Sequence, residues 1–349
     1  MTTPPQVVPP PGDGPEAETA GSWSPGPRDA ITDIAGIRVG HWTDRRAGTG
    51  CTVILCGKGM AAAVDARGGA PGTRETDVLA SANLVRQCHA ILFAGGSAFG
   101  LAAADGVMRW LAEREIGFAT AARPVPIVPA AVLYDLALGR AEPPTAEAGY
   151  IAAGRARGGA IQQGTVGAGT GATVAKLLGR EHCLKGGVGT ASLEGPRGIR
   201  VGAIVAVNAI GSLFDPETGT AIAAPRGEPG TFVPLPAALA RRTAQMDALL
   251  EHTTLICVAT NATLAHHELQ RLAYHAHDGL ARVVVPAHTF GDGDIAFAVS
   301  SAAVAIQPHD VLTVGVLGAR AVEIALLRGV QLASGLHGVP GVAEWLPTG

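Results

Sequence analysis

The sequence carries little charge and few aromatic side chains for its length. Charged residues make up 16% of the 349 residues and aromatic residues 4%, with a net charge of −3 at pH 7. The basic residues are scattered singly along the chain, whereas a surface that binds nucleic acid or an anionic membrane gathers lysine and arginine in clusters. We therefore expect the protein to bind neither nucleic acid nor a membrane.

Cysteine is scarce and irregularly spaced. An odd number of cysteines at irregular spacing in a long chain argues against a disulfide framework or a zinc site and favours reduced thiols. Most of them are predicted to be small core residues, as in the apolar run "LICVAT". We expect neither a metal nor a cofactor. The five cysteines are Cys51, Cys56, Cys88, Cys183 and Cys257.

Long apolar runs are also absent. Glycine, proline or a charged residue interrupts every apolar run before it reaches transmembrane length. Residues 1–28 are rich in proline and glycine, lack the basic and apolar regions of a secretory signal, and are predicted to be a flexible leader. A cytoplasmic protein with a single domain over residues 29–349 is expected, because a hydrophobic share of 47% supplies an ample core.

Short β-type runs alternate with amphipathic helical runs after the leader, which predicts an α/β fold. Residues 199–215 have the pattern of two strands in a hairpin that turns near residues 209–211. Further strands are predicted at residues 37–42, 51–56, 61–66, 89–96 and 294–301. Helices are predicted at residues 75–87, 97–115 and 311–333.

A well-patterned helix is predicted from about Leu264, with apolar residues at steps of three and four. No HExxH motif and no matching set of carboxylates accompanies the histidines on its polar face. A solvated helix face is therefore favoured over a metal site. These histidines are His266, His267, His275 and His277.

The segment "LFAGGSAFG" is close to the nucleophile elbow G-x-S-x-G of serine esterases. The fifth position of that motif needs a small residue, and here it is Phe99. We therefore favour a tight turn at Gly95 and Gly96, with Ser97 capping the following helix. The exposed N–H groups of this turn could line an anion or oxyanion site.

The segment "GTVGAGTGATVAK" contains Gly167-x-Gly169, a fragment of the dinucleotide-binding pattern. Ala172 stands where a third glycine is needed, no convincing strand precedes the segment, and no GK[ST] follows it. A nucleotide-binding oxidoreductase is therefore a weak alternative. Lys176 closes the segment and is one of only three lysines in the chain, which permits a specific role for a titratable amine.

Asp292 and Asp294 stand two residues apart before an apolar strand, so both carboxylates can point to one face. Gly293 between them allows another group to approach closely. Two carboxylates so close repel each other, which raises the pKa of one of them. The segment offers too few oxygen ligands for a calcium loop, and an ordinary acidic turn is the alternative.

A helical pattern over residues 241–252 meets a buried-looking strand that begins at Leu255. Thr253 and Thr254 lie at the joint. Because threonine favours strands, the pattern alone predicts two strand starters there.

Seven segments, taken together and in this order, resemble the DmpA-like aminopeptidases and the nylon-oligomer (aminohexanoate-oligomer) endohydrolases. The match runs from about Ile31 to the C-terminus. The segments are "AVDARGGAPGTRETDVL", "ILFAGGSAFGLAAADGVMRWL", "VPAAVLYDL", "GTVGAGTGATVAK", "AIVAVNAIGS", "HTTLICVATNATL" and "HTFGDGDIAF".

This resemblance implies an α/β (α+β) fold, arranged as a four-layer α-β-β-α sandwich like that of the N-terminal-nucleophile hydrolases. Family members are made as one chain that cuts itself in two. The residue at the new N-terminus is the nucleophile, which is serine in the aminopeptidases and threonine in the nylon-oligomer enzymes. The matching position here is Thr253, which implies an α-chain of residues 1–252 and a β-chain of residues 253–349.

The resemblance also implies roles for other residues. Lys176 would tune the ionisation of Thr253, and the Asn208 amide would donate to the oxyanion. Tyr134 matches a position near the substrate pocket. The implied catalytic set is Thr253, Asn208, Lys176, Asp292 and Asp294, of which the two aspartates match the Asp-x-Asp pair of the nylon-oligomer enzymes.

The implied activity is that of a self-processing amidase acting on small linear amides: short peptides, amino-acid amides or ω-amino-acid oligomers. A homo-oligomer is expected as well, because the family often forms tetramers. The chain departs from the nylon-oligomer enzymes at His252, where they have asparagine, so the rate and extent of self-cleavage stay open. The alternative is an unprocessed, catalytically silent homologue that binds small ligands or has a structural role.

Overall fold

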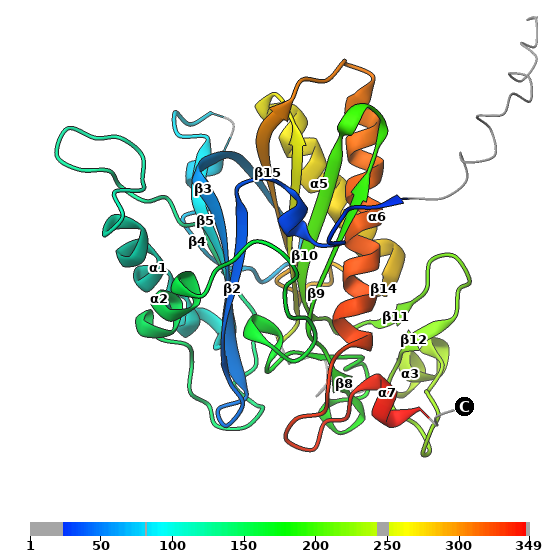
Figure 1. Ribbon diagram of the computed structural model, residues 1–349. Helices are drawn as coiled ribbons and strands as arrows, with labels where there is room; N and C mark the ends of the chain where they lie inside the picture. Colours follow the sequence, from blue (N-terminus) through cyan, green and yellow to red (C-terminus); the bar gives the residue numbers. More distant parts are fainter. Residues whose placement is uncertain (1–23, 81, 243–250, 347–349) are drawn as a thin grey trace, which may run out of the picture.

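The computed structural model describes residues 24–80, 82–242 and 251–346 (Figure 1). Most of the predicted leader and most of the predicted helix at residues 241–252 lie outside the described residues.

Two layers of β-strands lie between two pairs of helices (Figure 1). Helices α1 and α2 cover one side, on the left in Figure 1, and α5 and α6 cover the other. Three separate clusters of buried apolar residues fill the spaces between these four layers. The predicted α-β-β-α sandwich is therefore confirmed. The helices are α1 (Ala103–Ala112), α2 (Ala146–Gly154), α3 (Leu235–Arg241), α5 (His266–Val283), α6 (Asp310–Gln331) and α7 (Val342–Trp345).

The strands of the two layers form one continuous hydrogen-bonded sheet, in the order β1-β9-β10-β13-β15-β3-β5-β6-β4, with β2 also paired to β3. Strands β13 and β15 are parallel, and α5 connects them. The bounds are β1 (Ser24–Pro25), β2 (Ile37–Asp44), β3 (Thr49–Ala66), β4 (Gly72–Arg74), β5 (Gln87–Ala94), β6 (Ala130–Val132), β9 (Val188–Glu194), β10 (Arg200–Asn208), β13 (Thr253–Ala262) and β15 (Ile295–Val304).

Strand β3 belongs to both layers. Its first half pairs with β2 and β5, and its second half pairs with β15. The register shifts between Leu55 and Met60, where Gly57 and Gly59 adopt positive φ angles of 61° and 125°. The two strands predicted at residues 51–56 and 61–66 are thus one strand that bends between the layers.

Strand β10 is buried on both faces, and its side chains alternate between two cores. Val201, Ala203 and Val205 pack in the cluster that α5 and α6 cover. Ile204 and Ala206 belong to the cluster between the two strand layers. Successive side chains of a strand point to opposite faces, so an apolar run with no polar alternation fits an inner layer.

The remaining elements are short. The predicted helix at residues 97–115 is confirmed as a 3-10 turn followed by α1. The short strands are β7 (Thr173–Val174), β8 (Leu184–Lys185), β11 (Ser212–Phe214), β12 (Ala221–Ala223) and β14 (Val284–Val285). The 3-10 helices are Ile31–Asp33, Asp77–Leu79, Ser97–Ala102, Gly167–Gly169, Arg180–His182 and Pro196–Gly198.

The helix predicted at residues 75–87 is wrong. Among the residues described in this range, only Asp77–Leu79 form a helical turn, of the 3-10 type, and Gln87 already belongs to β5. Leu79 is buried, but Leu84 is 89% exposed. The amphipathic pattern therefore has no continuous surface to pack against, and most helical stability comes from such packing.

The hairpin predicted at residues 199–215 is also wrong. Strand β11 follows β10 but pairs with β12 and β14 instead. Gly211 lies against the backbone of Val285 and Pro286, where an added Cβ would stand 2.4 Å from the Pro286 oxygen. This close approach directs the chain away from β10.

Helix α5 confirms the helix predicted from about Leu264. The prediction of a solvated histidine face holds for exposed His267 but is wrong for His277, which is fully buried. The His277 Nε2 atom lies 3.0 Å from the backbone oxygen of Asp65 on β3. This contact gives one of the two ring nitrogens a partner where the helix places the ring against the sheet.

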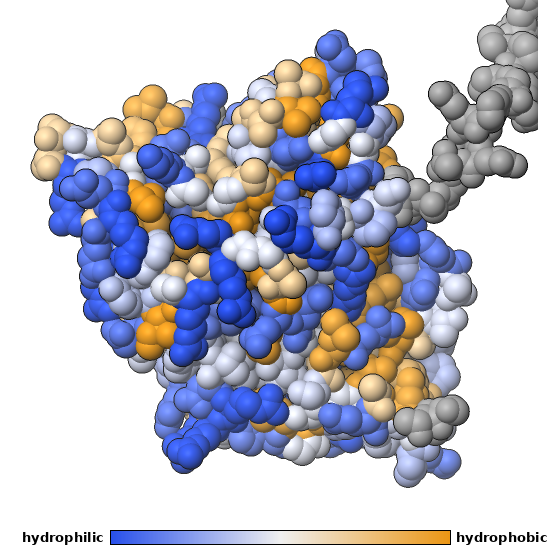
Figure 2. All heavy atoms as spheres, in the orientation of Figure 1, coloured by the Kyte–Doolittle hydropathy of each residue, from blue (hydrophilic) through white to orange (hydrophobic). Residues whose placement is uncertain are grey.

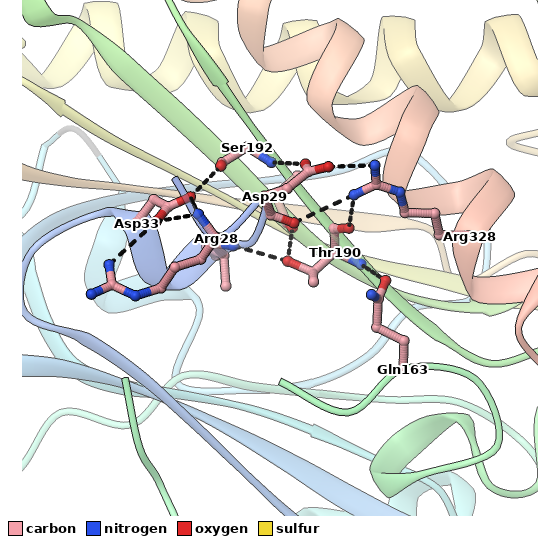
Figure 3. Close-up of polar contacts among 9 residues, drawn as sticks. Arg28, Asp29, Asp33, Gln163, Thr190, Ser192 and Arg328 are labelled. Atoms are coloured by element: carbon pink, nitrogen blue, oxygen red, sulfur yellow. Dashed lines mark hydrogen bonds and ion pairs between the residues drawn. The ribbon is translucent and has the colours of Figure 1, made fainter. Parts of the chain in front are cut away.

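Polar contacts hold the first described segment against β9 and α6 (Figure 3). Asp29 forms an ion pair with Arg328 of α6, 2.5 Å apart. Ser192 of β9 donates to Asp33 over 2.6 Å, and the Ile31 N–H donates to the Thr190 hydroxyl. These bonds fix the chain before it enters β2.

The face of the molecule drawn in Figure 2 is covered mainly by hydrophilic side chains, and hydrophobic ones gather at the lower right, around the lower half of α6. Across residues 24–346 as far as they are described, no helix is long and apolar enough to cross a membrane. All five cysteines are buried with free thiols, which confirms their assignment to the core.

Candidate active site

The ends of two neighbouring strands bring Asn208 and Thr253 together. Strand β10 ends at Asn208 and the antiparallel strand β13 begins at Thr253, and these two residues are direct partners in the register. Partners in an antiparallel pair place their side chains on the same face. Both residues are buried, at 0% and 6% exposure.

Lys176 reaches this pair from the loop after β7. Its ammonium group donates to the backbone and side-chain oxygens of Asn208, over 2.8 and 3.0 Å, and to the backbone oxygen of Glu251 over 3.0 Å. Burial lowers the pKa of Lys176 to about 7, although Cys183 and Asp292 act to raise it. A large neutral fraction near physiological pH allows this amine to exchange protons.

The side-chain amide of Asn208 has one possible orientation. Its Oδ1 atom accepts from Lys176 and from the Thr173 N–H, and a backbone N–H can only donate. The Nδ2 atom therefore points the other way and donates to the backbone oxygens of Tyr134 and Glu251, over 3.2 and 3.1 Å. Asn208 thus presents a fixed N–H donor beside Thr253.

The peptide carbonyl before Thr253 is held from two sides. The Gly293 N–H donates to the His252 oxygen over 2.8 Å, and the Thr253 hydroxyl contacts the same oxygen. A Cβ at Gly293 would stand 2.7 Å from the Thr253 hydroxyl oxygen. The close approach predicted at Gly293 is therefore present, and the approaching group is Thr253.

Asp292 and Asp294 lie on either side of Gly293 and are both buried. The Asp294 carboxylate accepts from the Thr254 N–H over 2.6 Å, and the Asp292 carboxylate accepts from the Thr289 N–H over 2.6 Å. Burial, reinforced by repulsion from Asp294, raises the pKa of Asp292 to about 6. This confirms the predicted mutual repulsion of the pair.

A glycine turn that follows β3 supports the two aspartates from behind. The N–H groups of Arg67 and Gly68 donate to the Asp294 backbone oxygen, and the Ala70 N–H donates to that of Asp292. A Cβ at Gly68 would stand 2.3 Å from the Asp292 oxygen. The glycine at this position is therefore required by close backbone contact, a role that the sequence pattern did not reveal.

A cavity of about 160 Å³ opens beside Lys176. Tyr134 lines it, and the Arg180 guanidinium lies 5.8 Å from the centre of the Tyr134 ring. Arg180 also forms an ion pair with Glu251. Sequence reasoning missed both charged residues, because arginine and glutamate at such positions are typical of any solvated surface.

The turn at Gly95 and Gly96 binds a side-chain carboxylate of the protein itself. The Gly96 N–H donates to the Asp135 carboxylate over 2.7 Å, whereas the Ser97 N–H donates to the Leu133 oxygen. The N-cap residue of the 3-10 helix is Gly96, and Ser97 is already the first residue of that helix. The predicted Ser97 cap is therefore wrong, and the ligand of the turn is an internal carboxylate.

Asp135 belongs to a second buried polar cluster that sequence reasoning also missed. Thr49 donates to its carboxylate over 2.8 Å. Burial raises the pKa of Asp135 to about 6 and lowers that of nearby Lys185 to about 7. Lys185 is fully buried and donates to the backbone oxygens of Thr170 and Ala172.

The glycines at 167 and 169 allow close packing within the fold. A Cβ at Gly167 would stand 2.3 Å from the Thr52 hydroxyl, and one at Gly169 would stand 2.4 Å from the Val188 nitrogen. Their small size is thus explained without a nucleotide. In the described part of the chain, no three His, Cys, Asp or Glu side chains are grouped to hold a metal ion.

The family model of peptidase family S58 matches residues 29–343. The chain belongs to this family. The match covers strands β2 to β15, helices α1 to α6, the start of α7 and every residue of the candidate site.

Curated relatives of this S58 family member include enzymes with two kinds of name. An uncharacterized aminopeptidase of Mycobacterium tuberculosis is 43% identical and covers 91% of this chain and 98% of its own length. A 6-aminohexanoate-oligomer endohydrolase of an Agromyces species is 32% identical, over 77% of this chain and 74% of its own. The family and these relatives identify the protein as a hydrolase of amide or peptide bonds.

Solved structures agree on the fold. The L-aminopeptidase D-Ala-esterase/amidase of Ochrobactrum anthropi, described as a variant of the N-terminal-nucleophile hydrolase fold, has a TM-score of 0.71 at 22% identity, covering 91% of this chain and 90% of that one. A β-aminopeptidase of a Burkholderia species has a TM-score of 0.65 at 24% identity, covering 92% and 93%.

Proposed function

We propose that this S58 peptidase is a self-processing amidase whose nucleophile is Thr253. The observation that carries the proposal is the contact between the Thr253 hydroxyl and the carbonyl of His252, which the Gly293 N–H also holds. Lys176 and Asn208 bind the preceding carbonyl, that of Glu251. A nucleophile and a polarised carbonyl are thus assembled at one peptide bond, and a titratable amine binds the carbonyl before it.

Self-cleavage begins when the Thr253 oxygen attacks the carbonyl carbon of His252. The hydroxyl proton passes to the Thr253 nitrogen as the C–N bond breaks, which leaves an ester between the two residues and a free amine. Water then hydrolyses the ester to the His252 carboxylate and restores the Thr253 hydroxyl. In the first step, the Gly293 N–H stabilises the negative charge that develops on the carbonyl oxygen.

Substrate hydrolysis repeats this chemistry with an external amide. The new α-amino group of Thr253 has a reference pKa of about 7.7–8.0, so it is partly neutral and can take the hydroxyl proton. The resulting acyl-enzyme ester is hydrolysed by water, and the amine half of the substrate leaves with a proton. Asn208 supplies an N–H donor for the oxyanion once the Glu251 carbonyl no longer occupies it.

The substrates we propose are small linear amides, namely short peptides, amino-acid amides or ω-amino-acid oligomers. The names of the relatives, aminopeptidase and 6-aminohexanoate-oligomer endohydrolase, support this class. The cavity of about 160 Å³ beside Lys176 suits a short chain. We also propose a homo-oligomer, a tetramer, which light scattering on the purified protein tests.

Intact-mass analysis tests the nucleophile. We expect two fragments, one ending at His252 and one beginning at Thr253. Thr253→Val should leave a single uncut chain without amidase activity, because valine keeps the shape of threonine but has no hydroxyl.

The matched control is Thr254→Val. Thr254 is fully buried, and its hydroxyl has no hydrogen-bond partner within the described part of the chain. This variant should cut itself and hydrolyse amides at close to the wild-type rate. Normal hydrolysis by Thr253→Val would sink the proposal, and a wild-type chain that stays uncut and inactive would favour the silent homologue.

A further inference from the structure

In the uncut chain, the donors that would bind the acyl half of a substrate bind carbonyl groups of the chain itself. This inference rests on the proposed function. The His252 oxygen accepts from the Gly293 N–H, and the Glu251 oxygen accepts from Lys176 and Asn208 over 3.0 and 3.1 Å. Two successive carbonyl groups before the attacked bond are therefore bound by fixed donors. An extended substrate can present its attacked carbonyl to Gly293 and Asn208, and its preceding carbonyl to Lys176.

The side chain of Glu251 lies at the cavity beside these donors. Its carboxylate pairs with the Arg180 guanidinium at the wall of the cavity that Tyr134 and Lys176 also line. Arg180 starts the short 3-10 helix after Gly179, and its guanidinium lies over the Tyr134 ring. The cation is thus positioned by the fold and by an aromatic surface.

Cleavage changes this pair. Among the described residues, no other carboxylate pairs with Arg180. After the cut, Glu251 is the second residue from a free chain end and no longer fixed by the peptide bond to Thr253. A carboxylate from a substrate can then take its place against Arg180.

We propose that Arg180 forms a carboxylate-binding subsite on the acyl side of the reaction centre. The enzyme would then prefer amides with an acidic group on the residue before the one whose carbonyl is attacked. Arg180 acts as a specificity residue, and Glu251 fills its subsite until the chain is cut.

Three chromogenic probes that copy residues 251–252 test this preference on the processed wild-type protein. They are N-acetyl-Glu-His-p-nitroanilide and its Gln-His and Lys-His counterparts. We expect kcat/KM to be about five- to tenfold higher for the Glu probe than for the isosteric Gln probe, and lowest for the Lys probe. Because Arg180 is 42% exposed, the preference should be modest and decrease at high salt.

Variants then assign the preference to Arg180. Arg180→Gln should bring the Glu and Gln probes to similar kcat/KM while changing the rate of the Gln probe less than about threefold. The double variant R180Q/E251Q should give the same result as the single variant, and it avoids leaving the Glu251 carboxylate without its partner. The control is Arg123→Gln, an exposed arginine on the loop after α1, which should keep the full preference.

Equal kcat/KM of wild type for the Glu and Gln probes at low salt would overturn the subsite, as would a cut enzyme that hydrolyses simple amides but none of the probes. A variant R180Q that retains the preference, or that lowers both rates equally, would do the same. Since the wild-type comparison needs no variant, poor folding of R180Q does not prevent a decision. An uncut, inactive wild type would instead overturn the proposed function.

Discussion

Lys176 and Lys185 are both buried, but their surroundings differ. Lys176 lies in the loop just after β7, and Lys185 is the last residue of β8. Burial lowers the pKa of each to about 7. Lys176 lies at the wall of a cavity and donates to the backbone of Glu251, next to the proposed cleavage site. Lys185 is enclosed and donates to two loop carbonyls, those of Thr170 and Ala172.

This difference teaches that a shifted pKa alone does not identify a catalytic group. The same burial acts on both amines, but only Lys176 adjoins Thr253's strand partner, Asn208, and open space for a substrate. Lys185 instead balances the buried Asp135 carboxylate. Geometry therefore separates a proposed chemical role from a structural one, and matched substitutions can test that separation.

The largest effect is expected for Lys176→Met, which removes the amine but keeps most of the side-chain volume. We expect kcat for amide hydrolysis to fall about 10²-fold or more, because a positioned proton-transfer group is lost. The free energy of unfolding should fall by less than about 1 kcal/mol, since water from the cavity can replace the lost donor. Kinetics and chemical denaturation measure the two quantities, and mass analysis reports self-cleavage.

Lys58→Met is the matched control, because Lys58 is the third lysine of the chain and is exposed. It should leave both kcat and stability unchanged. Wild-type kcat in the Lys176 variant would remove the distinction between the two buried lysines.

A smaller effect of the opposite kind is expected for Lys185→Met. This change leaves the carbonyl groups of Thr170 and Ala172 without a donor in a site closed to water, and leaves Asp135 without its nearby cation. The free energy of unfolding should fall by about 1–3 kcal/mol. The kcat of the protein that remains folded should stay within about threefold of wild type. A large loss of kcat with unchanged stability would contradict the structural role.

The fold was predictable from sequence to the extent that local patterns determine it. The strands predicted from the apolar runs at 89–96 and 294–301 correspond to β5 and β15, because strands of an inner layer need apolar residues on both faces. The pattern at 75–87 failed, since amphipathicity does not show whether a packing surface exists. The four-layer arrangement itself came from family resemblance.

The candidate site was harder to predict from individual residues than the fold was. Asn208 and Thr253 meet only because β10 and β13 pair in one particular register, which neither strand's pattern specifies. Resemblance supplied those two residues and the role of Lys176. It supplied neither Arg180 nor Lys185, because their surroundings depend on loop positions that a linear sequence does not encode.

The pH dependence of stability offers the last comparison of the two lysines. Each amine has a folded pKa of about 7 and an unfolded value of 10.5. Between about pH 7 and pH 10 the unfolded chain therefore holds a proton that the folded chain lacks, so stability rises with pH by up to about 1.4 kcal/mol per pH unit for each lysine. Denaturant titrations at pH 7.5, 8.5 and 9.5 should show a shallower rise for Lys176→Met and for Lys185→Met alike. An unchanged slope in either variant would mean that its lysine stays protonated in the fold. Equal losses of slope beside unequal losses of kcat would show that the two amines share the same proton equilibrium but not the same function.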